Sequence, residues 1–181
     1  MARVLIPLAD GCEEMEAVIV ADVLRRAGIE VAIAGLKEGI ITASRDVHLI
    51  PDTLWDEVDT SHYDMIILPG GMGGTQALCE HDGVQTTLGE FAMNKKLIGA
   101  ICAAALALYK AGILDGRPFT CYPGIEDMMD DSVNRLDDRV VEDGNLITSQ
   151  GPGTAIEFAL KIVERLADAE TAAKVAEGML V

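Results

Sequence analysis

The alternation of strand-like and helical segments at the start of the chain limits the fold more than any other feature. Residues 3–8 form an apolar run of strand length, residues 13–27 follow a helical period that ends at Gly28, and residues 29–34 form the next apolar run. A strand, a helix and a strand in about thirty residues make a βαβ unit, which requires a parallel sheet with a right-handed crossover. We therefore expect an α/β fold.

The same alternation continues through the middle of the chain. Residues 64–68 read as a buried strand that ends at Pro69, residues 83–94 as a helix, and residues 97–101 as a strand that runs directly into a helix over residues 103–111. This order predicts a doubly wound, mostly parallel sheet flanked by helices.

Two regions depart from the alternation and predict added β-hairpins. Residues 39–50 and residues 140–148 each place short apolar runs on both sides of polar turn residues. Farther along the chain, Thr154 and Glu157 have the spacing of a capping box, which predicts the start of a helix. No repeat or linker divides the chain, so we expect one domain over residues 1–181.

The charge balance of the chain excludes several classes of partner. Its 30 acidic and 14 basic residues give a net charge of −16, so nucleic acid and anionic membrane surfaces are poor partners. The longest apolar run, residues 97–109, is shorter than the roughly 18 to 20 residues that a membrane span needs. Because the start of the chain also lacks a signal-peptide pattern, we expect a cytoplasmic protein whose four scattered cysteines are reduced thiols.

Cys102 occupies the junction between the strand over residues 97–101 and the helix that follows. This junction lies at the carboxyl edge of a parallel sheet, where open α/β sheets bind ligands. The start of a helix also presents free N–H groups and the positive end of the helix dipole, and both favour thiolate over thiol. Two interpretations stay open: a nucleophilic cysteine with a low pKa, or a small core residue between Ala100 and Ala103.

Glu16 heads the apolar stripe of the first helix, which consists of Ile19, Val20, Val23, Leu24 and Ala27. A carboxyl group on a buried face is costly unless it is paired or neutral, so it has a raised pKa or a function. The alternative is that Glu16 only caps its own first turn. Its neighbours Glu13 and Glu14 are interpreted as first-turn acids exposed to water.

A glycine-rich segment, Pro69-Gly-Gly-Met-Gly-Gly74, follows a strand and reaches the same edge of the sheet. Its backbone N–H groups can point at an anion, which predicts an oxyanion hole, and a plain tight turn is the alternative. The glycine spacing does not match a dinucleotide-binding fingerprint. The three histidines, in contrast, fall in or beside expected loops and are interpreted as solvated: His48, His62 and His81.

Five segments occur in one order from the first strand to the last helix: Glu13-Glu-Met-Glu-Ala17, Ser44-Arg45-Asp46, Leu68-Pro-Gly-Gly71, Ala100-Ile-Cys-Ala103 and Thr148-Ser-Gln-Gly-Pro-Gly-Thr154. Together they resemble the ThiJ/PfpI superfamily, and more narrowly its branch of the parkinsonism-associated protein deglycase and bacterial relatives. The resemblance implies a flavodoxin-like sandwich, a homodimer and a reactive cysteine at a nucleophile elbow.

The resemblance also implies roles for individual residues. By motif match, Cys102 is the reactive cysteine and Glu16 is the buried acid beside it. Gly71 and Ala103 match the positions whose backbone N–H groups form the anion pocket of the family. Arg45 matches an arginine that approaches the site from the partner subunit.

Two positions depart from the family pattern. Many members have a histidine directly after the cysteine, where this chain has Ala103. Close relatives often have a histidine just before a proline near the pocket, where this chain has Tyr122 as a possible contributor. Without an adjacent imidazole, a cysteine peptidase or amidase lacks its general base, so this is the least favoured function.

Two functions are left open. The first is a glyoxalase or deglycase, without cofactor or metal, that acts on small α-oxoaldehydes such as methylglyoxal and glyoxal or on their early adducts. In it Cys102 attacks the aldehyde and Glu16 moves protons. The second is a redox-responsive, stress-protective protein or chaperone that senses peroxide through oxidation of Cys102.

Overall fold

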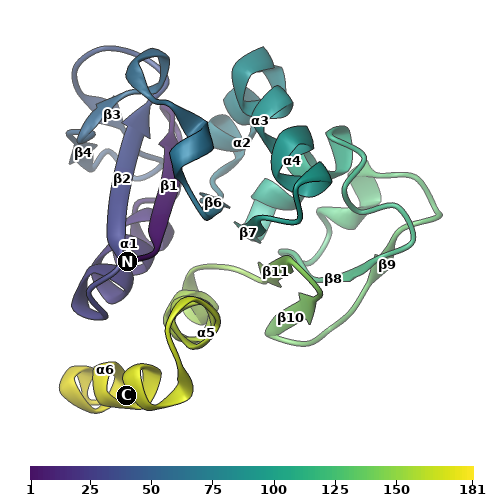
Figure 1. The fold of residues 1–181 in the computed structure, drawn as a ribbon. Helices are drawn as coiled ribbons and strands as arrows, with labels where there is room; N and C mark the ends of the chain where they lie inside the picture. The colour runs from purple at the N-terminus through teal and green to yellow at the C-terminus, as the bar shows by residue number, and fades with distance from the viewer.

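The centre of the molecule is a seven-stranded sheet with helices on both faces (Figure 1). The computed structural model describes residues 1–181 and orders the strands β10-β11-β7-β6-β1-β2-β5. Their bounds are β1 (Arg3–Leu8), β2 (Glu30–Gly35), β5 (Thr53–Leu54), β6 (Met65–Leu68), β7 (Leu97–Ile101), β10 (Val140–Asp143) and β11 (Leu146–Ser149). All neighbours pair in parallel except β10 and β11, which confirms the predicted mostly parallel α/β sheet.

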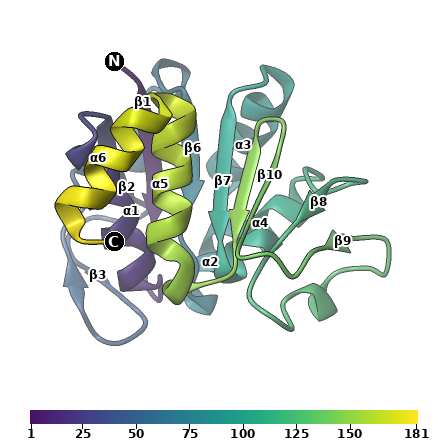
Figure 2. The same cartoon turned by 90° about the horizontal axis from the view of Figure 1, so that it is seen from below.

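Helices cover both faces because alternate strand residues are apolar on both sides of the sheet. In β6, for example, Met65 and Ile67 join one group of core residues, and Ile66 and Leu68 join the other. One helical layer consists of α1 (Glu14–Arg26), α5 (Ala155–Leu166) and α6 (Ala169–Met179). The other consists of α2 (Met72–Glu80), α3 (Asp82–Met93) and α4 (Ala105–Lys110). In Figure 2, α5 and α6 cover one face of the sheet.

The chain reverses its direction of travel across the sheet between β1 and β6. From β1 it proceeds to β2 and β5 on one side, and then it returns to build β6, β7 and β11 on the other. Open α/β sheets bind ligands beyond the carboxyl ends of the strands at such a switch point. The loops that follow β1, β6 and β7 are neighbours there, with the β6 loop in the middle.

Both predicted hairpins are present. β3 (Ile41–Thr42) pairs antiparallel with β4 (His48–Leu49), and β10 pairs antiparallel with β11. A second small sheet, in which β8 (Pro118–Phe119) and β9 (Asn134–Arg135) run parallel, was not predicted. These two short strands show no hydrophobic period, and no turn between apolar runs marks them as it marks β3 and β4.

Five short 3₁₀ helices complete the architecture: η1 (Trp55–Glu57), η2 (Thr60–His62), η3 (Cys102–Ala104), η4 (Glu126–Met128) and η5 (Pro152–Thr154). The predicted helix over residues 103–111 is therefore divided into η3 and α4. None of the helices combines the length and the hydropathy that crossing a lipid bilayer requires.

The capping box predicted for Thr154 and Glu157 is wrong. Thr154 Oγ1 accepts the Gly151 N–H at 3.1 Å and lies 2.6 Å from Ser149 Oγ, so its hydroxyl binds the preceding turn instead of the helix. Glu157 forms an ion pair with Arg139 at 2.7 Å. The Thr154 hydroxyl is hydrogen-bonded to residues at and after the end of β11, so it does not accept from the N–H groups of α5.

Candidate active site

Cys102 lies at the sharp turn from β7 into η3, at the carboxyl edge of the sheet. Its φ of +63° is in the left-handed region, which costs a non-glycine residue about 1–3 kcal/mol and persists only where the surroundings enforce it. The Cys102 carbonyl accepts the Tyr122 N–H at 3.4 Å, and the side chain is partly buried. The turn thus presents the thiol at the switch point of the sheet.

Glu16 is 0% exposed, as its place on the apolar stripe of α1 predicts. The Gly70 N–H donates to Glu16 Oε2 at 2.7 Å, whereas the buried Oε1 has no hydrogen-bond partner. Glu16 therefore does not cap its own helix. Its carboxyl reaches the loop after β6, and its second oxygen is left for a proton or a ligand.

The glycine loop fills the space between Glu16 and Cys102. A Cβ added to Gly70 would lie 2.6 Å from Glu16 Oε2 and 2.7 Å from Cys102 Cβ. A Cβ added to Gly71, which has a φ of +82°, would lie 2.4 Å from the Gly11 carbonyl oxygen. Glycine is required at both positions because backbone from neighbouring loops meets there.

Burial and the charge of Glu16 raise the pKa of the Cys102 thiol to about 12, against the backbone N–H groups of Ala103 and Gly71, which lower it. The acidic thiol expected from the helix start is therefore wrong, chiefly because the thiol is buried. η3 is a three-residue 3₁₀ helix, so it supplies few aligned peptide dipoles to offset the burial. The two N–H groups predicted for the anion pocket, those of Ala103 and Gly71, nevertheless act to lower the pKa of this thiol.

Burial raises the pKa of the Glu16 carboxyl to about 7, against hydrogen bonds from the Gly70 N–H and the Cys102 thiol, and the charge of Glu13 adds to the rise. The charge of Glu16 opposes ionisation of Cys102, whereas the Cys102 thiol, as a hydrogen-bond donor, favours the Glu16 anion. The pair therefore loses one proton near neutral pH and retains the second to high pH. Above a pH of about 7 the pair holds one proton, and the two pKa values place it on the Cys102 sulfur.

Arg45 and Tyr122 lie at the periphery. Arg45 is exposed, and its guanidinium donates to the Ser44 carbonyl at 3.0 Å. Within one chain, Arg45 therefore lies outside the Glu16–Cys102 pair. Tyr122 is 52% exposed, and its ring would lie 3.2 Å from a Cβ added to Gly151. The structure of one chain thus brings together Cys102, Glu16, Gly71 and Ala103, and it places Tyr122 next to Cys102 only through the backbone.

Comparison with known proteins agrees with this arrangement. Residues 2–165 match the DJ-1/PfpI family. The chain belongs to the DJ-1/PfpI family. It is 49% identical to Protein dj-1beta of Drosophila melanogaster, over 98% of this chain and 96% of that protein. The crystal structure of Drosophila DJ-1beta has a TM-score of 0.96, with 47% identity over 99% of this chain and 98% of that chain.

Two further DJ-1/PfpI relatives bear on chemistry. The glutathione-independent glyoxalase DJR-1.2 of Caenorhabditis elegans is 39% identical, over 91% of this chain and 88% of that protein. The structure of oxidized Toxoplasma gondii DJ-1 has a TM-score of 0.94, with 38% identity over 99% of this chain and 98% of that chain. The family resemblance drawn from the sequence motifs is confirmed.

In this DJ-1/PfpI chain, the first-turn acids of α1 are not both exposed to water, contrary to the prediction. Glu14 is 7% exposed and accepts hydrogen bonds from the Ser44 hydroxyl at 3.0 Å and from the Arg45 N–H at 2.9 Å. The Ser44 hydroxyl also lies 3.0 Å from Glu13 Oε2. The β3–β4 hairpin closes over the start of α1, and contacts across 31 sequence positions leave no local signal.

One of the three histidines also differs from its predicted state. His48 and His62 are exposed, as expected. His81 instead packs edge-on against Trp55, with ring centroids 5.8 Å apart, and its Nδ1 accepts the Val84 N–H at 3.3 Å to cap α3. None of the three is among the groups that shift the pKa of Cys102.

The four cysteines are free thiols, as predicted, but only two are accessible. Cys12 and Cys121 are 1% and 0% exposed, and burial raises the pKa of these thiols to about 12 and about 11. Cys79 is partly buried in the helical layer that consists of α2, α3 and α4. Among the thiols, only Cys102 combines access with backbone N–H donors.

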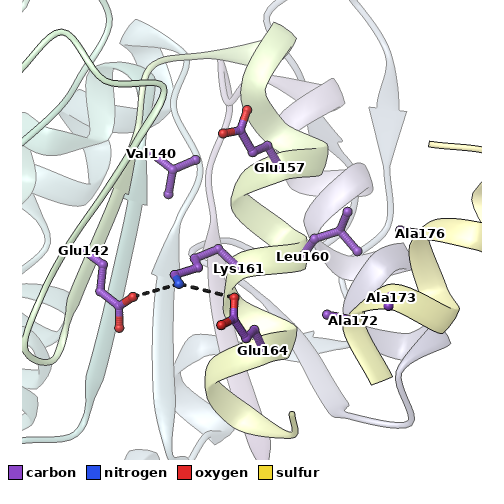
Figure 3. A pocket seen from close by; sticks show the side chains of 9 residues that line it. All are labelled: Val140, Glu142, Glu157, Leu160, Lys161, Glu164, Ala172, Ala173 and Ala176. Carbon is purple, nitrogen blue, oxygen red and sulfur yellow. Dashed lines mark hydrogen bonds and ion pairs between the residues drawn. The ribbon is translucent and has the colours of Figure 1, made fainter. Parts of the chain in front are cut away.

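A separate cavity of about 460 Å³ lies between β10, α5 and α6 and contains no residue of the Cys102 site (Figure 3). On its wall, Lys161 Nζ lies 3.2 Å from a carboxylate oxygen of Glu142 and 3.2 Å from one of Glu164. These two contacts raise the pKa of the Lys161 ammonium. A protonated lysine between two carboxylates is not a nucleophile, so the candidate chemistry stays with Cys102.

Proposed function

We propose that the protein is a cysteine-dependent glyoxalase that converts small α-oxoaldehydes such as methylglyoxal and glyoxal to 2-hydroxy acids. One observation carries the proposal: Glu16, with an unpartnered buried oxygen, faces a partly accessible Cys102 whose sulfur meets two backbone N–H groups. A nucleophile, a proton carrier and oxyanion donors are the groups that this reaction needs. Early amine or thiol adducts of the same aldehydes, the substrates of a deglycase, present the same reacting carbons.

The reaction begins with transfer of the thiol proton to the Glu16 carboxylate. As Glu16 takes this proton, the Cys102 sulfur attacks the aldehyde carbon of methylglyoxal to form a hemithioacetal. The N–H groups of Gly71 and Ala103 stabilise the developing oxyanion, which then takes the proton from Glu16.

The rest of the reaction moves protons between carbons. The Glu16 carboxylate removes the proton from the former aldehyde carbon to give an enediol, and a proton returned to the neighbouring carbon gives a thioester. Water then hydrolyses the thioester to lactate and releases the Cys102 thiol. The sum is methylglyoxal plus water to lactate, with no external oxidant or reductant. A carboxyl whose pKa is about 7 suits both donation and acceptance.

The relatives support this assignment. A DJ-1/PfpI protein that is 39% identical over nearly the same length is named a glutathione-independent glyoxalase. A peptidase is disfavoured because Ala103 follows the cysteine and no histidine acts on Cys102.

A second function, sensing of peroxide, is favoured by the same donors. Backbone N–H groups at a partly accessible sulfur stabilise sulfenate and sulfinate oxygens as well as an oxyanion, and a protonated Glu16 adds a further donor. A structure of a DJ-1 relative in an oxidized state is known.

The test separates the two functions. Lactate formation from methylglyoxal is measured for the wild type with and without prior peroxide, and the mass of Cys102 peptides is recorded in parallel. For the enzyme we expect turnover that is lost when Cys102 gains oxygen atoms. Oxidation of Cys102 without any turnover in the reduced protein would favour the sensor instead.

A further inference from the structure

Tyr122 combines a fixed backbone with an exposed aromatic ring beside the Cys102 turn. Its N–H donates to the Cys102 carbonyl at 3.4 Å, and its own carbonyl accepts the Ile125 N–H at 3.0 Å. The side chain is nevertheless 52% exposed. Because removal of aromatic surface from water is favourable, a half-exposed ring on a fixed backbone offers a contact surface to a ligand at Cys102.

The register of the sheet places this ring on one side of Cys102. β11 pairs in parallel with β7, and Ser149 lies opposite Ile101, so residues 150–151 leave the sheet beside Cys102. The Tyr122 ring packs on Gly151, where an added Cβ would lie 3.2 Å from the ring atom Cδ2. The ring therefore lies over the loop that follows β11, next to the loop that carries the thiol.

The opposite side of Cys102 has no room for a large substituent of a substrate. β6 pairs with β7 on that side, and a Cβ added to Gly70 would lie 2.6 Å from Glu16 Oε2 and 2.7 Å from Cys102 Cβ. Glu16 itself is fully buried. A molecule that reaches the Cys102 sulfur therefore extends toward the β11 side, where the Tyr122 ring is exposed.

The turn after Tyr122 is held in place by side-chain contacts. Glu126 Oε2 accepts the Gly124 N–H at 2.8 Å, and Glu126 Oε1 lies 3.2 Å from Nε of the largely buried Arg135. Pro123 restricts the backbone directly after Tyr122. Because the backbone is fixed and a tyrosine has only two side-chain torsions, the ring loses little conformational entropy when a ligand packs against it.

We infer that Tyr122 is a specificity-determining residue whose ring forms one wall of the substrate site and favours α-oxoaldehydes, R–CO–CHO, with a large apolar group R. The inference rests on the proposed function, since it concerns the part of the aldehyde that does not react. When Cys102 holds the aldehyde carbon and the N–H groups of Gly71 and Ala103 bind its oxygen, R lies two bonds away, on the open side. A phenyl group there packs against the ring, whereas the hydrogen of glyoxal does not.

The first test compares two substrates of the same reaction. Phenylglyoxal plus water gives mandelate, and glyoxal plus water gives glycolate, so kcat/KM is measured for both in wild type, Tyr122→Ala and Tyr122→Phe. We expect the ratio of phenylglyoxal to glyoxal to fall by roughly three- to tenfold in Tyr122→Ala, chiefly through the KM of phenylglyoxal, and to be retained in Tyr122→Phe. The matched control is Met128→Ala, since Met128 is 60% exposed on η4 of the same segment, and its ratio stays at the wild-type value.

The second test does not depend on turnover. Phenacyl bromide and bromoacetone, R–CO–CH₂Br with a phenyl or a methyl group as R, both alkylate a thiol with loss of bromide and of the thiol proton. The rates at Cys102 are followed by peptide mass spectrometry in the same four proteins. We expect Tyr122→Ala to lower the ratio of the phenyl to the methyl reagent by the same roughly three- to tenfold factor.

Two results would overturn the inference: wild-type ratios in Tyr122→Ala, or an equal fall in Met128→Ala. A ring that only supported the Gly151 loop would slow both members of each pair equally and leave the ratios unchanged, so this outcome also counts against it. Thermal unfolding followed by circular dichroism verifies that each variant is folded. A wild type that converts neither aldehyde, with a preference for phenacyl bromide that Tyr122→Ala loses, would contradict the proposed function and leave the role of Tyr122 intact.

Discussion

A carboxyl group that is fully buried and titrates near neutral pH makes the stability of the fold depend on pH. Folded protein keeps the Glu16 proton up to a pKa of about 7, whereas the unfolded chain releases it near 4.5. The unfolded state therefore binds fewer protons between these values, and stability falls as the pH rises from 4.5 to 7.

Glu16→Gln removes this dependence. We expect the variant to gain up to about 3 kcal/mol relative to the wild type at pH values above about 7, and little at pH values near 4. Urea unfolding of both proteins at the two pH values measures the difference. An equal difference at both pH values would mean that Glu16 does not retain its proton in the folded state.

The same variant tests the chemical role of Glu16. Glutamine can keep the bond from the Gly70 N–H but cannot carry a proton between carbons, so methylglyoxal turnover should fall by about 10²- to 10⁴-fold in a folded protein. Steady-state lactate formation is the measurement. Turnover at the wild-type rate would reduce Glu16 to a structural residue.

Residues whose roles follow from local periodicity could be predicted, and those with distant partners could not. Glu16 and Cys102 were found because one heads a helical stripe and the other ends an apolar strand. Glu14 and His81 were assigned to solvent, since their partners Ser44 and Trp55 are far away along the chain. The pKa of Cys102 was also beyond reach, because burial depends on how neighbouring loops pack.

At the scale of elements, the site depends most on the geometry of the loop between β6 and α2. Gly71 has a φ of +82° and backbone within 2.4 Å of an added Cβ, whereas Gly39 has a φ of +80° and nothing within 4 Å. Alanine substitutions at the two glycines therefore separate the effect of backbone strain from the effect of steric crowding.

We expect Gly39→Ala to lose only the roughly 1 to 3 kcal/mol of left-handed strain and to keep its activity. Gly71→Ala must also move the loop away from Gly11, which displaces an oxyanion donor and should lower turnover by about 10²-fold. Thermal melts and lactate formation are compared for both variants. Equal activity in the two would show that the loop position is not critical.

Long periodic elements could be predicted closely, and short ones could not. The bounds of β1 and β7 match the predicted strands residue for residue. β5, β8 and β9 were missed because they pair in parallel with strands distant in the sequence, so no turn between apolar runs marks them as it marks the equally short β3 and β4. The two oxyanion donors, at the start of α2 and in η3, directly follow β6 and β7, so their place follows from the strands that precede them.

At the scale of the whole molecule, we propose that two chains form a homodimer over the outer face of α1 and the β3–β4 hairpin. Met15 and Val18 are 53% and 48% exposed on α1, outside its buried stripe, and Arg45 projects from the hairpin. A two-fold interface would cover these apolar side chains in both chains at once.

Light scattering should then give a mass near twice the 19.2 kDa of one chain. Arg45→Ala should raise the methylglyoxal concentration needed for half-maximal turnover by about tenfold without unfolding the protein, because a guanidinium from the partner would help to hold the oxyanion. A fully active monomer would contradict both the dimer and the shared site.

The central claim, that Cys102 performs the chemistry, is tested most directly by lactate formation from methylglyoxal in wild type, Cys102→Ser and Cys121→Ser under identical conditions. Cys121 is the matched control, a fully buried thiol without the N–H donors of Cys102. The account predicts a loss of at least about 10³-fold in Cys102→Ser, since a serine hydroxyl without a base is a poor nucleophile, and near wild-type turnover in Cys121→Ser. Turnover in folded Cys102→Ser at a rate close to that of the wild type would contradict it.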